Sequence, residues 1–406
     1  MKVNRVLCLL LGSWLLLGAC HDSKENPLPN EEESRTVLAY IVGDNNLSSF
    51  LPDDALEMME GLEQMKDING HLLVYADMGS KPTLLELYRK GSEVGYTIIQ
   101  EFESNRNSMG VEEMKEVMSI AFSPKYQANH YGLVLWSHGD AWYPYPLPSA
   151  SSRWIGQDKS NGDDRMNVDE LAEALQSVPH LDFLMLDLCF GGSIELMYEI
   201  KEYADYIIAS PTEIPGPGAP YDQVVMQMFN TAYTGTDYVL PMARAYFDHY
   251  NNLYDENSIC TNDHWTGGVS VAMLKCSELT ALARATRTVW TSGTVDIEKL
   301  KQMVLDYDKR SNYPSSYVGY FDLWQIVEEV ATDEAVQSAW KQAFAAAVPY
   351  FQTTPRNYSA ALGHTFSMEG SRGVSCYLPK SDTDKAMPFY RTLAWYQDAG
   401  LSSLGW

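Results

Sequence analysis

Two stretches decide the fold: FLMLDLCFGG, residues 183–192, and YGLVLWSHGD, residues 131–140. Each is an apolar run of strand length that ends at one reactive side chain, Cys189 in the first and His138 in the second, with glycine close behind. Continuous apolar runs indicate strands that are buried on both faces, as in a parallel sheet. The sequence therefore places a thiol and an imidazole at the ends of two buried strands.

Outward from these two stretches, apolar strands alternate with amphipathic helices. The order predicts an α/β fold with a mostly parallel central sheet flanked by helices on both faces. Ligands of such sheets bind beyond the carboxyl ends of the strands, where both reactive residues stand. Strands are predicted at 36–43, 71–78, 131–137, 183–190 and 206–210, a hairpin at 84–102, and helices at 53–66, 111–122, 167–178 and 193–203.

The second half of the chain shows a less regular pattern. We assign residues 36–250 to the core and residues 251–406 to a C-terminal region that completes or extends it. Whether the later strands join the first sheet or build a second domain stays open at this point. Helices are predicted at 222–231, 237–250, 278–291, 297–307, 322–331 and 334–348, and strands at 267–274 and 372–379.

The N-terminus carries a targeting signal. MKVNR is followed by the apolar run VLCLLLGSWLLLGAC, so residues 1–19 are predicted to be a signal peptide. Its last residues, LGAC, resemble a bacterial lipobox in which Cys20 is lipidated; a plain secretory signal is the alternative. His21 in place of Asp points to the outer membrane or cell surface. Residues 20–35 are acidic and contain prolines, as in a flexible tether.

Charge and cysteine content limit the partners. The formal net charge is −25, and cleavage would remove Lys2 and Arg5 and lower it to −27. Such a surface repels nucleic acid and favours basic partners, or it serves solubility alone. Four cysteines would remain besides the lipidated one, and an exported protein could pair some of them. The sequence contains no CxxC and no zinc-spaced Cys/His cluster, so no metal ligands are predicted.

The paired residues suit nucleophilic catalysis. A cysteine nucleophile needs a nearby base, which His138 would supply before it protonates the leaving amine. A helix starting near Ser193 would favour the thiolate of Cys189, and Gly191 would let a substrate backbone come close. The backbone N–H groups of Gly139 and Cys189 could form an oxyanion hole. The alternative is a core cysteine and a structural histidine, and the residues alone leave both interpretations open.

Several motifs are similar to those of one enzyme family. LVLWSHGDAW (133–142) and DLCFGG (187–192) resemble the His and Cys motifs of the clostripain family of cysteine peptidases. YIVGDNNLSSF (40–50), YIIASPTEIPGPGAPYD (206–222) and GVSCYLP (373–379) agree with this resemblance. The resemblance covers residues 36–225 well and the rest thinly, and it implies the caspase-like three-layer sandwich of caspases, gingipains and legumain.

The resemblance also implies roles for particular residues. His138 matches the catalytic histidine and Cys189 the nucleophile. Asp187 matches the acid that lines the S1 pocket and pairs with a basic P1 side chain, although this chain has Asp-Leu-Cys where the family has Asp-Ala-Cys. A structural role for Asp187 is the alternative. Glu213 and Asp222 are weaker candidates for a second S1 acid.

Family members are often activated by cleavage between their His and Cys strands. The corresponding segment here, residues 140–166, is predicted to be a long exposed loop, and it contains Arg153, Lys159 and Arg165 as basic cleavage sites. An uncut loop is the alternative. The chemistry requires no cofactor. Some members depend on calcium, which acidic residues such as Asp163 would suit, but we name no ligands.

The predicted function is therefore a cysteine endopeptidase that hydrolyses peptide or protein substrates after arginine or lysine. A catalytically silent relative that binds peptide or glycan at the cell surface is the first alternative. A cysteine-dependent acyltransferase or amidase with the same dyad is the second.

Overall fold

The computed structural model describes residues 34–405, apart from 105, 145–154, 231–237, 293–294, 314–315 and 381–383. The predicted signal peptide, Cys20 and most of the predicted tether lie outside the described residues. Glu33–Trp406 form one compact unit. Within the described part, none of the helices is both long and apolar enough to cross a membrane.

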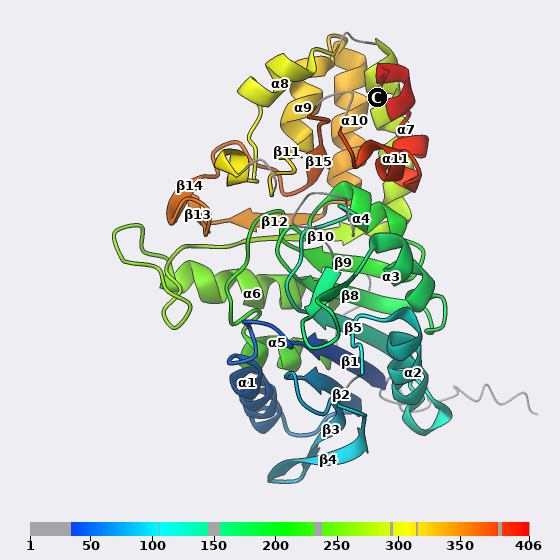
Figure 1. Ribbon diagram of the computed structural model, residues 1–406, viewed down its shortest axis with the longest axis vertical. Helices are drawn as coiled ribbons and strands as arrows, with labels where there is room; N and C mark the ends of the chain where they lie inside the picture. Colours follow the sequence, from blue (N-terminus) through cyan, green and yellow to red (C-terminus); the bar gives the residue numbers. More distant parts are fainter. Residues whose placement is uncertain are drawn as a thin grey trace, which may run out of the picture. The chain divides into compact units, whose positions relative to one another are not determined.

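Nine strands form one sheet in the order β12-β10-β9-β8-β5-β1-β2-β3-β4 (Figure 1). The five strands from β9 to β2 are parallel, and antiparallel strands extend the sheet at both ends. The strands are β1 Arg35–Val42, β2 Gly70–Asp77, β3 Thr83–Lys90, β4 Glu93–Glu101, β5 His130–Trp136, β8 Leu181–Asp187, β9 Ala204–Ala209, β10 Ser270–Lys275 and β12 Tyr350–Thr353.

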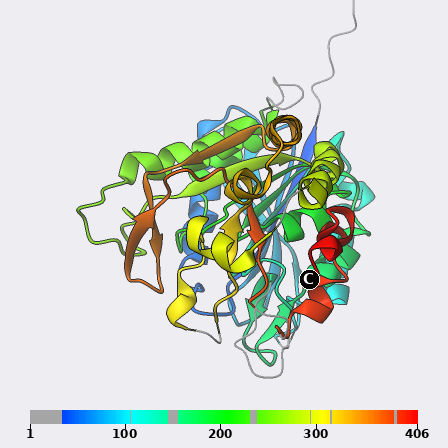
Figure 2. The same ribbon diagram turned by 90° about the horizontal axis from the view of Figure 1, so that it is seen from above.

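Helices cover both faces of this sheet (Figures 1 and 2). Side chains of β8 alternate between the two cores: Phe183 and Met185 pack with the first set of helices, and Leu184 and Leu186 with the second. The predicted three-layer α/β fold is thereby confirmed. The first set is α1 Leu51–Gln64, α5 Tyr221–Met228 and α6 Leu240–Leu253; the second is α2 Val111–Ala121, α3 Val168–Leu175, α4 Ile194–Glu199 and α7 Cys276–Ser292.

The C-terminal half contributes β10 and β12 to this same sheet. The strand predicted at 372–379 is short and lies outside it, because β15 pairs with β11 instead. Backbone N–H of Ser375 donates to Gly192 O across 3.0 Å, which ties this part of the chain to the start of α4. The remaining elements are β11 Tyr320–Asp322, β13 Arg356–Ser359, β14 His364–Ser367, β15 Ser375–Tyr377, α8 Ile297–Met303, α9 Leu323–Val330, α10 Glu334–Ala347, α11 Met387–Tyr390 and α12 Ala394–Asp398.

The segment 140–166 differs from the exposed loop expected from its composition. Its described second half forms an antiparallel pair, β6 Ile155–Asp158 and β7 Asp164–Met166, and all four residues of β6 are buried. Backbone N–H of Gly156 donates to His138 O across 2.8 Å. Four residues with a glycine and two polar side chains are too short a run to show a strand in the sequence, so long-range packing decided this element.

Candidate active site

The register of the sheet brings the two reactive residues together. Trp136, the last residue of β5, pairs with Asp187, the last residue of β8. His138 and Cys189 each lie two residues further on, and both line one cavity of about 220 Å³. We call residues 137–141 the histidine loop and residues 188–192 the cysteine loop. These loops leave neighbouring parallel strands at the carboxyl edge, as the sequence predicted.

A third residue fixes the imidazole. Nε2 of His138 lies 2.6 Å from Oδ1 of Asn46, in the turn between β1 and α1. A carboxamide oxygen only accepts, so Nε2 carries the proton and Nδ1 is the basic nitrogen of the neutral ring. Asn46 is not among the site residues predicted from the sequence. The available signal was its place after β1, the strand that neighbours β5 at the same edge of the sheet.

Burial keeps both reactive groups neutral. It lowers the pKa of His138 to about 4, and the charges of Lys159 and Arg165 act in the same direction. Burial, aided by the charge of Glu213, raises the pKa of Cys189 to about 12. The expectation that a helix near Ser193 would favour the thiolate is therefore not met, since α4 spans only six residues and desolvation outweighs it. In these protonation states the imidazole can act as a general base toward the thiol.

The cysteine loop has an unusual backbone. Phe190 adopts the left-handed region, with φ 58°, which is rare for a bulky side chain. Its N–H donates to Thr212 O across 2.9 Å, and Ile214 N–H points at Cys189 Sγ at 3.4 Å. Surrounding contacts thus hold a conformation that the chain would not adopt alone, as often happens where a backbone presents a reactive group.

The two loops touch at Gly139. A Cβ atom built there would lie 2.7 Å from Leu188 Cβ and 3.0 Å from Cys189 O, so only glycine fits this approach. Across the described part of the chain, the N–H groups of Gly139 and Cys189 have no hydrogen-bond acceptor. Two such donors beside a nucleophile have the chemistry of an oxyanion hole.

Asp187 lies in the core beneath the site. Its side chain is fully buried and accepts hydrogen bonds from Ala219 N (2.8 Å), Tyr221 Oη (2.9 Å) and Tyr246 Oη (2.8 Å). Burial raises its pKa, and these three donors oppose that effect. In a continuous strand, Asp187 and Cys189 would share a face, because they are two positions apart. The strand ends at Asp187, however, and Cys189 packs against the core on the other face.

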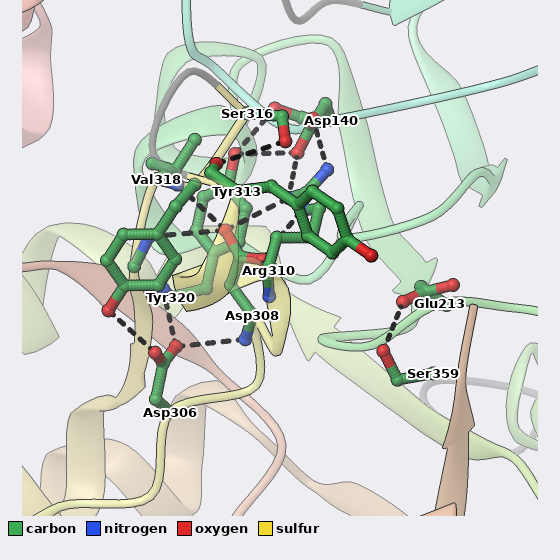
Figure 3. Close-up of polar contacts among 12 residues, drawn as sticks. Asp140, Glu213, Asp306, Asp308, Arg310, Tyr313, Ser316, Val318, Tyr320 and Ser359 are labelled. Atoms are coloured by element: carbon green, nitrogen blue, oxygen red, sulfur yellow. Dashed lines mark hydrogen bonds and ion pairs between the residues drawn. The ribbon is translucent and has the colours of Figure 1, made fainter. Parts of the chain in front are cut away.

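Glu213 is the one carboxylate among the described residues that line the cavity. It also lines an adjoining cavity of about 390 Å³ that shares His138 and Cys189. Its carboxylate accepts from Ser359 Oγ across 3.0 Å (Figure 3) and from Ala360 N across 2.9 Å. Burial raises its pKa. Asp222, the other candidate for a second acid, lies at the start of α5.

The basic residues of segment 140–166 differ in exposure and in their ion pairs. Lys159 is exposed in the turn between β6 and β7. Arg165 is half-buried in β7 and forms an ion pair with Asp163 at 2.8 Å. Arg153 lies outside the described residues.

Three other acids have the chemistry of a calcium ligand set. Asp44, Asp77 and Asp158 are buried, and one carboxylate oxygen from each lies within 4.8 Å of the others. Burial raises the pKa of Asp158 to about 6 and also raises the pKa of Asp77. Carboxylate oxygens are the ligands that calcium prefers, so these residues fit such an ion if one binds. Asp163, which the sequence suggested as an acid suited to calcium, does not belong to this group.

Comparisons with known proteins agree with this geometry. The model of the clostripain family matches residues 39–405. Clostripain of Hathewaya histolytica is 23% identical over an alignment 433 residues long, gaps included, and the match covers 92% of this chain and 81% of that protein.

Two solved structures are similar over almost their whole length. One is a secreted C11 cysteine protease from Bacteroides thetaiotaomicron in complex with an irreversible peptide inhibitor. It has a TM-score of 0.82 and 39% identity, and the match covers 91% of this chain and 99% of that one. The other is an inactive zymogen C11 protease from Parabacteroides distasonis. It has a TM-score of 0.75 and 28% identity, and the match covers 92% of this chain and 99% of that one.

Proposed function

The chain belongs to the clostripain family, and from that premise we propose that it cleaves peptide bonds after arginine or lysine through a dyad of Cys189 and His138. It is a cysteine peptidase, and this chemistry needs no cofactor. The observation that supports the dyad best is the register of β5 and β8, which sets both residues on one cavity. The Asn46 acceptor on His138 Nε2 supports the assignment further.

The proposed reaction starts from neutral groups. His138 Nδ1 takes the thiol proton as Cys189 Sγ attacks the carbonyl carbon of the scissile bond. The N–H groups of Gly139 and Cys189 stabilise the oxyanion. The imidazolium then gives its proton to the leaving amine, and water hydrolyses the thioester by the reverse proton path. Asn46 keeps Nε2 protonated and the ring oriented throughout, as the third group of a catalytic triad does.

The preference for a basic P1 residue would come from two acids at different depths. Glu213 lines the cavity and can meet an ammonium or guanidinium group directly. Asp187 lies behind the residues that line the cavity, beside Gly218 and Trp136. A Cβ atom built at position 218 would be 2.5 Å from Asp187 Oδ2 and 2.4 Å from Trp136 Nε1. Asp187 would act as an S1 acid from below the pocket floor.

Export and processing are further parts of the proposal. The N-terminal sequence supports a lipoprotein anchored through Cys20 at the outer membrane or cell surface. Self-cleavage in segment 140–166 is supported by the exposed Lys159 and by the zymogen form of the Parabacteroides relative. Among the basic residues described in this segment, Lys159 is the better site, because Arg165 is held in a strand by its ion pair.

Fluorogenic peptides that differ only at P1, with Arg, Lys, Asp or Asn, test this function. We expect cleavage after Arg or Lys that disappears in Cys189→Ala and persists in Cys276→Ala, a control thiol at the start of α7. Cleavage after Asp or Asn would refute the S1 assignment, and activity that survives Cys189→Ala would refute the dyad. Glu213→Gln and Asp187→Asn, compared on the Arg peptide, rank the two acids.

A further inference from the structure

One arginine from the C-terminal half lies beside both catalytic loops. Arg310 forms a bidentate ion pair with Asp140: Nη1 donates to Oδ2 across 2.7 Å and Nη2 to Oδ1 across 2.9 Å (Figure 3). A bidentate contact with the planar guanidinium fixes both the position and the orientation of a carboxylate. Asp140 directly follows Gly139, so this ion pair holds the histidine loop.

The same guanidinium contacts the cysteine loop through an aromatic ring. Cζ of Arg310 lies 4.7 Å from the ring centroid of Phe190, the residue after Cys189. Tyr320 packs against this ring with centroids 5.1 Å apart, and its hydroxyl donates to Asp140 O across 2.6 Å. Arg310 and Tyr320 therefore each touch both loops, from a segment distant in the sequence.

The arginine is itself held firmly. Its Nε and Nη2 donate to Asp308 across 2.6 and 3.0 Å. Asp308 is buried and also accepts a hydrogen bond from Val318 N across 2.8 Å (Figure 3). Asp306, two residues earlier, accepts one from Tyr317 Oη across 2.7 Å. The guanidinium is thus anchored on the chain that leads into β11, which belongs to neither catalytic loop.

We propose that Arg310 is a positioning residue that sets the spacing between the loop of His138 and the loop of Cys189. This inference rests on the proposed function. Four hydrogen bonds to two carboxylates occupy the guanidinium, so it acts through Asp140 and Phe190. Its charge also lowers the pKa of the Cys189 thiol, against the opposite effects of burial, Glu213 and Asp140.

Arg310→Lys is the direct test, because lysine keeps the positive charge but cannot form the bidentate contact. A displacement of about 1 Å at a catalytic centre costs about 100-fold in rate. We expect kcat on the Arg peptide to fall by about that factor, with KM changed less than about threefold. Tyr320→Phe, which removes one hydroxyl, should lower kcat by a smaller factor. Arg287→Lys is the matched control, since its guanidinium ties α7 to the backbone of α12, away from both loops.

A second readout separates positioning from general stability. In Arg310→Met, the lost charge should move the pH dependence of Cys189 alkylation by iodoacetamide to higher pH, and no such shift is expected in Arg287→Lys. A folded Arg310→Lys enzyme with unchanged kcat, or with a raised KM alone, overturns the inference. The inference is also overturned if kcat falls only in proportion to the fraction of enzyme that is folded. If Cys189→Ala still cleaves the Arg peptide at the wild-type rate, the proposed function itself has failed. If Cys189→Ala abolishes cleavage but the Arg310 and Tyr320 variants cleave normally, only this inference has failed.

Discussion

Substituting Gly139 by alanine should separate the two catalytic loops. Its φ angle is not in the left-handed region, so alanine is acceptable to the backbone, and any effect comes from space. The new methyl group would lie 2.7 Å from Leu188 Cβ and 3.0 Å from Cys189 O. Ordinary carbon contacts begin at about 3.5 Å. The loops must therefore move apart by roughly 0.8 Å, since the clash involves backbone and a Cβ atom that no rotamer change can relieve.

That displacement acts on the distance between base and nucleophile and on one oxyanion donor. Because about 1 Å costs about 100-fold, we expect Gly139→Ala to lower kcat/KM by roughly 30- to 100-fold. The free energy of unfolding should fall by about 1–3 kcal/mol from overpacking. Initial rates on the Arg peptide and urea unfolding followed by circular dichroism measure the two effects on the same preparation.

A crowded glycine away from the dyad provides the control. A Cβ at Gly61, in α1, would lie 3.1 Å from backbone oxygens of Tyr221 and Asp222. Gly61→Ala should change stability through similar crowding and leave kcat within about twofold of wild type. If Gly139→Ala keeps kcat/KM within about threefold while remaining folded, the loops do not meet as described and the reasoning is wrong.

Three further predictions concern protonation and orientation. Because burial lowers the pKa of His138 to about 4, the imidazole stays a free base in mild acid, and kcat/KM should fall only as the pH approaches 4; an acid limb near 6.5 would contradict this. Asn46→Ala should lower kcat by about 10- to 100-fold with little change in KM. Asn46→Asp keeps the hydrogen-bond acceptor, but its charge should raise the pKa of His138 and move the acid limb of kcat/KM to higher pH. If wild type and Asn46→Asp have the same pH–rate profile, Asn46 does not orient His138. Asp54 is buried in α1, its Oδ2 lacks a hydrogen-bond partner within the described residues, and burial raises its pKa to about 9. The folded-state pKa thus exceeds the unfolded value of about 3.9, so stability is lost as pH rises between the two. Asp54→Asn should then stabilise the protein by at least about 1 kcal/mol at pH 8 and not at pH 4, and equal shifts in Tm at both pH values would contradict the burial argument.

The sequence by itself determined the strands that carry the dyad. Apolar runs such as 131–137 and 183–188 depend on a few neighbouring residues, and their burial follows from composition alone. The alternation of strands and helices then required a parallel centre, and this brought the ends of β5 and β8 to one edge. The capping box of Asn167 and Glu170, which starts α3, is equally local, since its two residues lie three positions apart.

Only the tertiary structure decided the groups around that dyad. Arg310 and Asp140 are separated by 170 positions, and no local pattern indicates their contact. Asn46 reaches His138 across 92 positions for the same reason. The pKa values of His138 and Cys189 depend on desolvation, which is a property of the whole packed surroundings, so the short α4 could not produce the thiolate that the sequence suggested. Side-chain identity is local, whereas burial and partner choice are set by how distant segments pack.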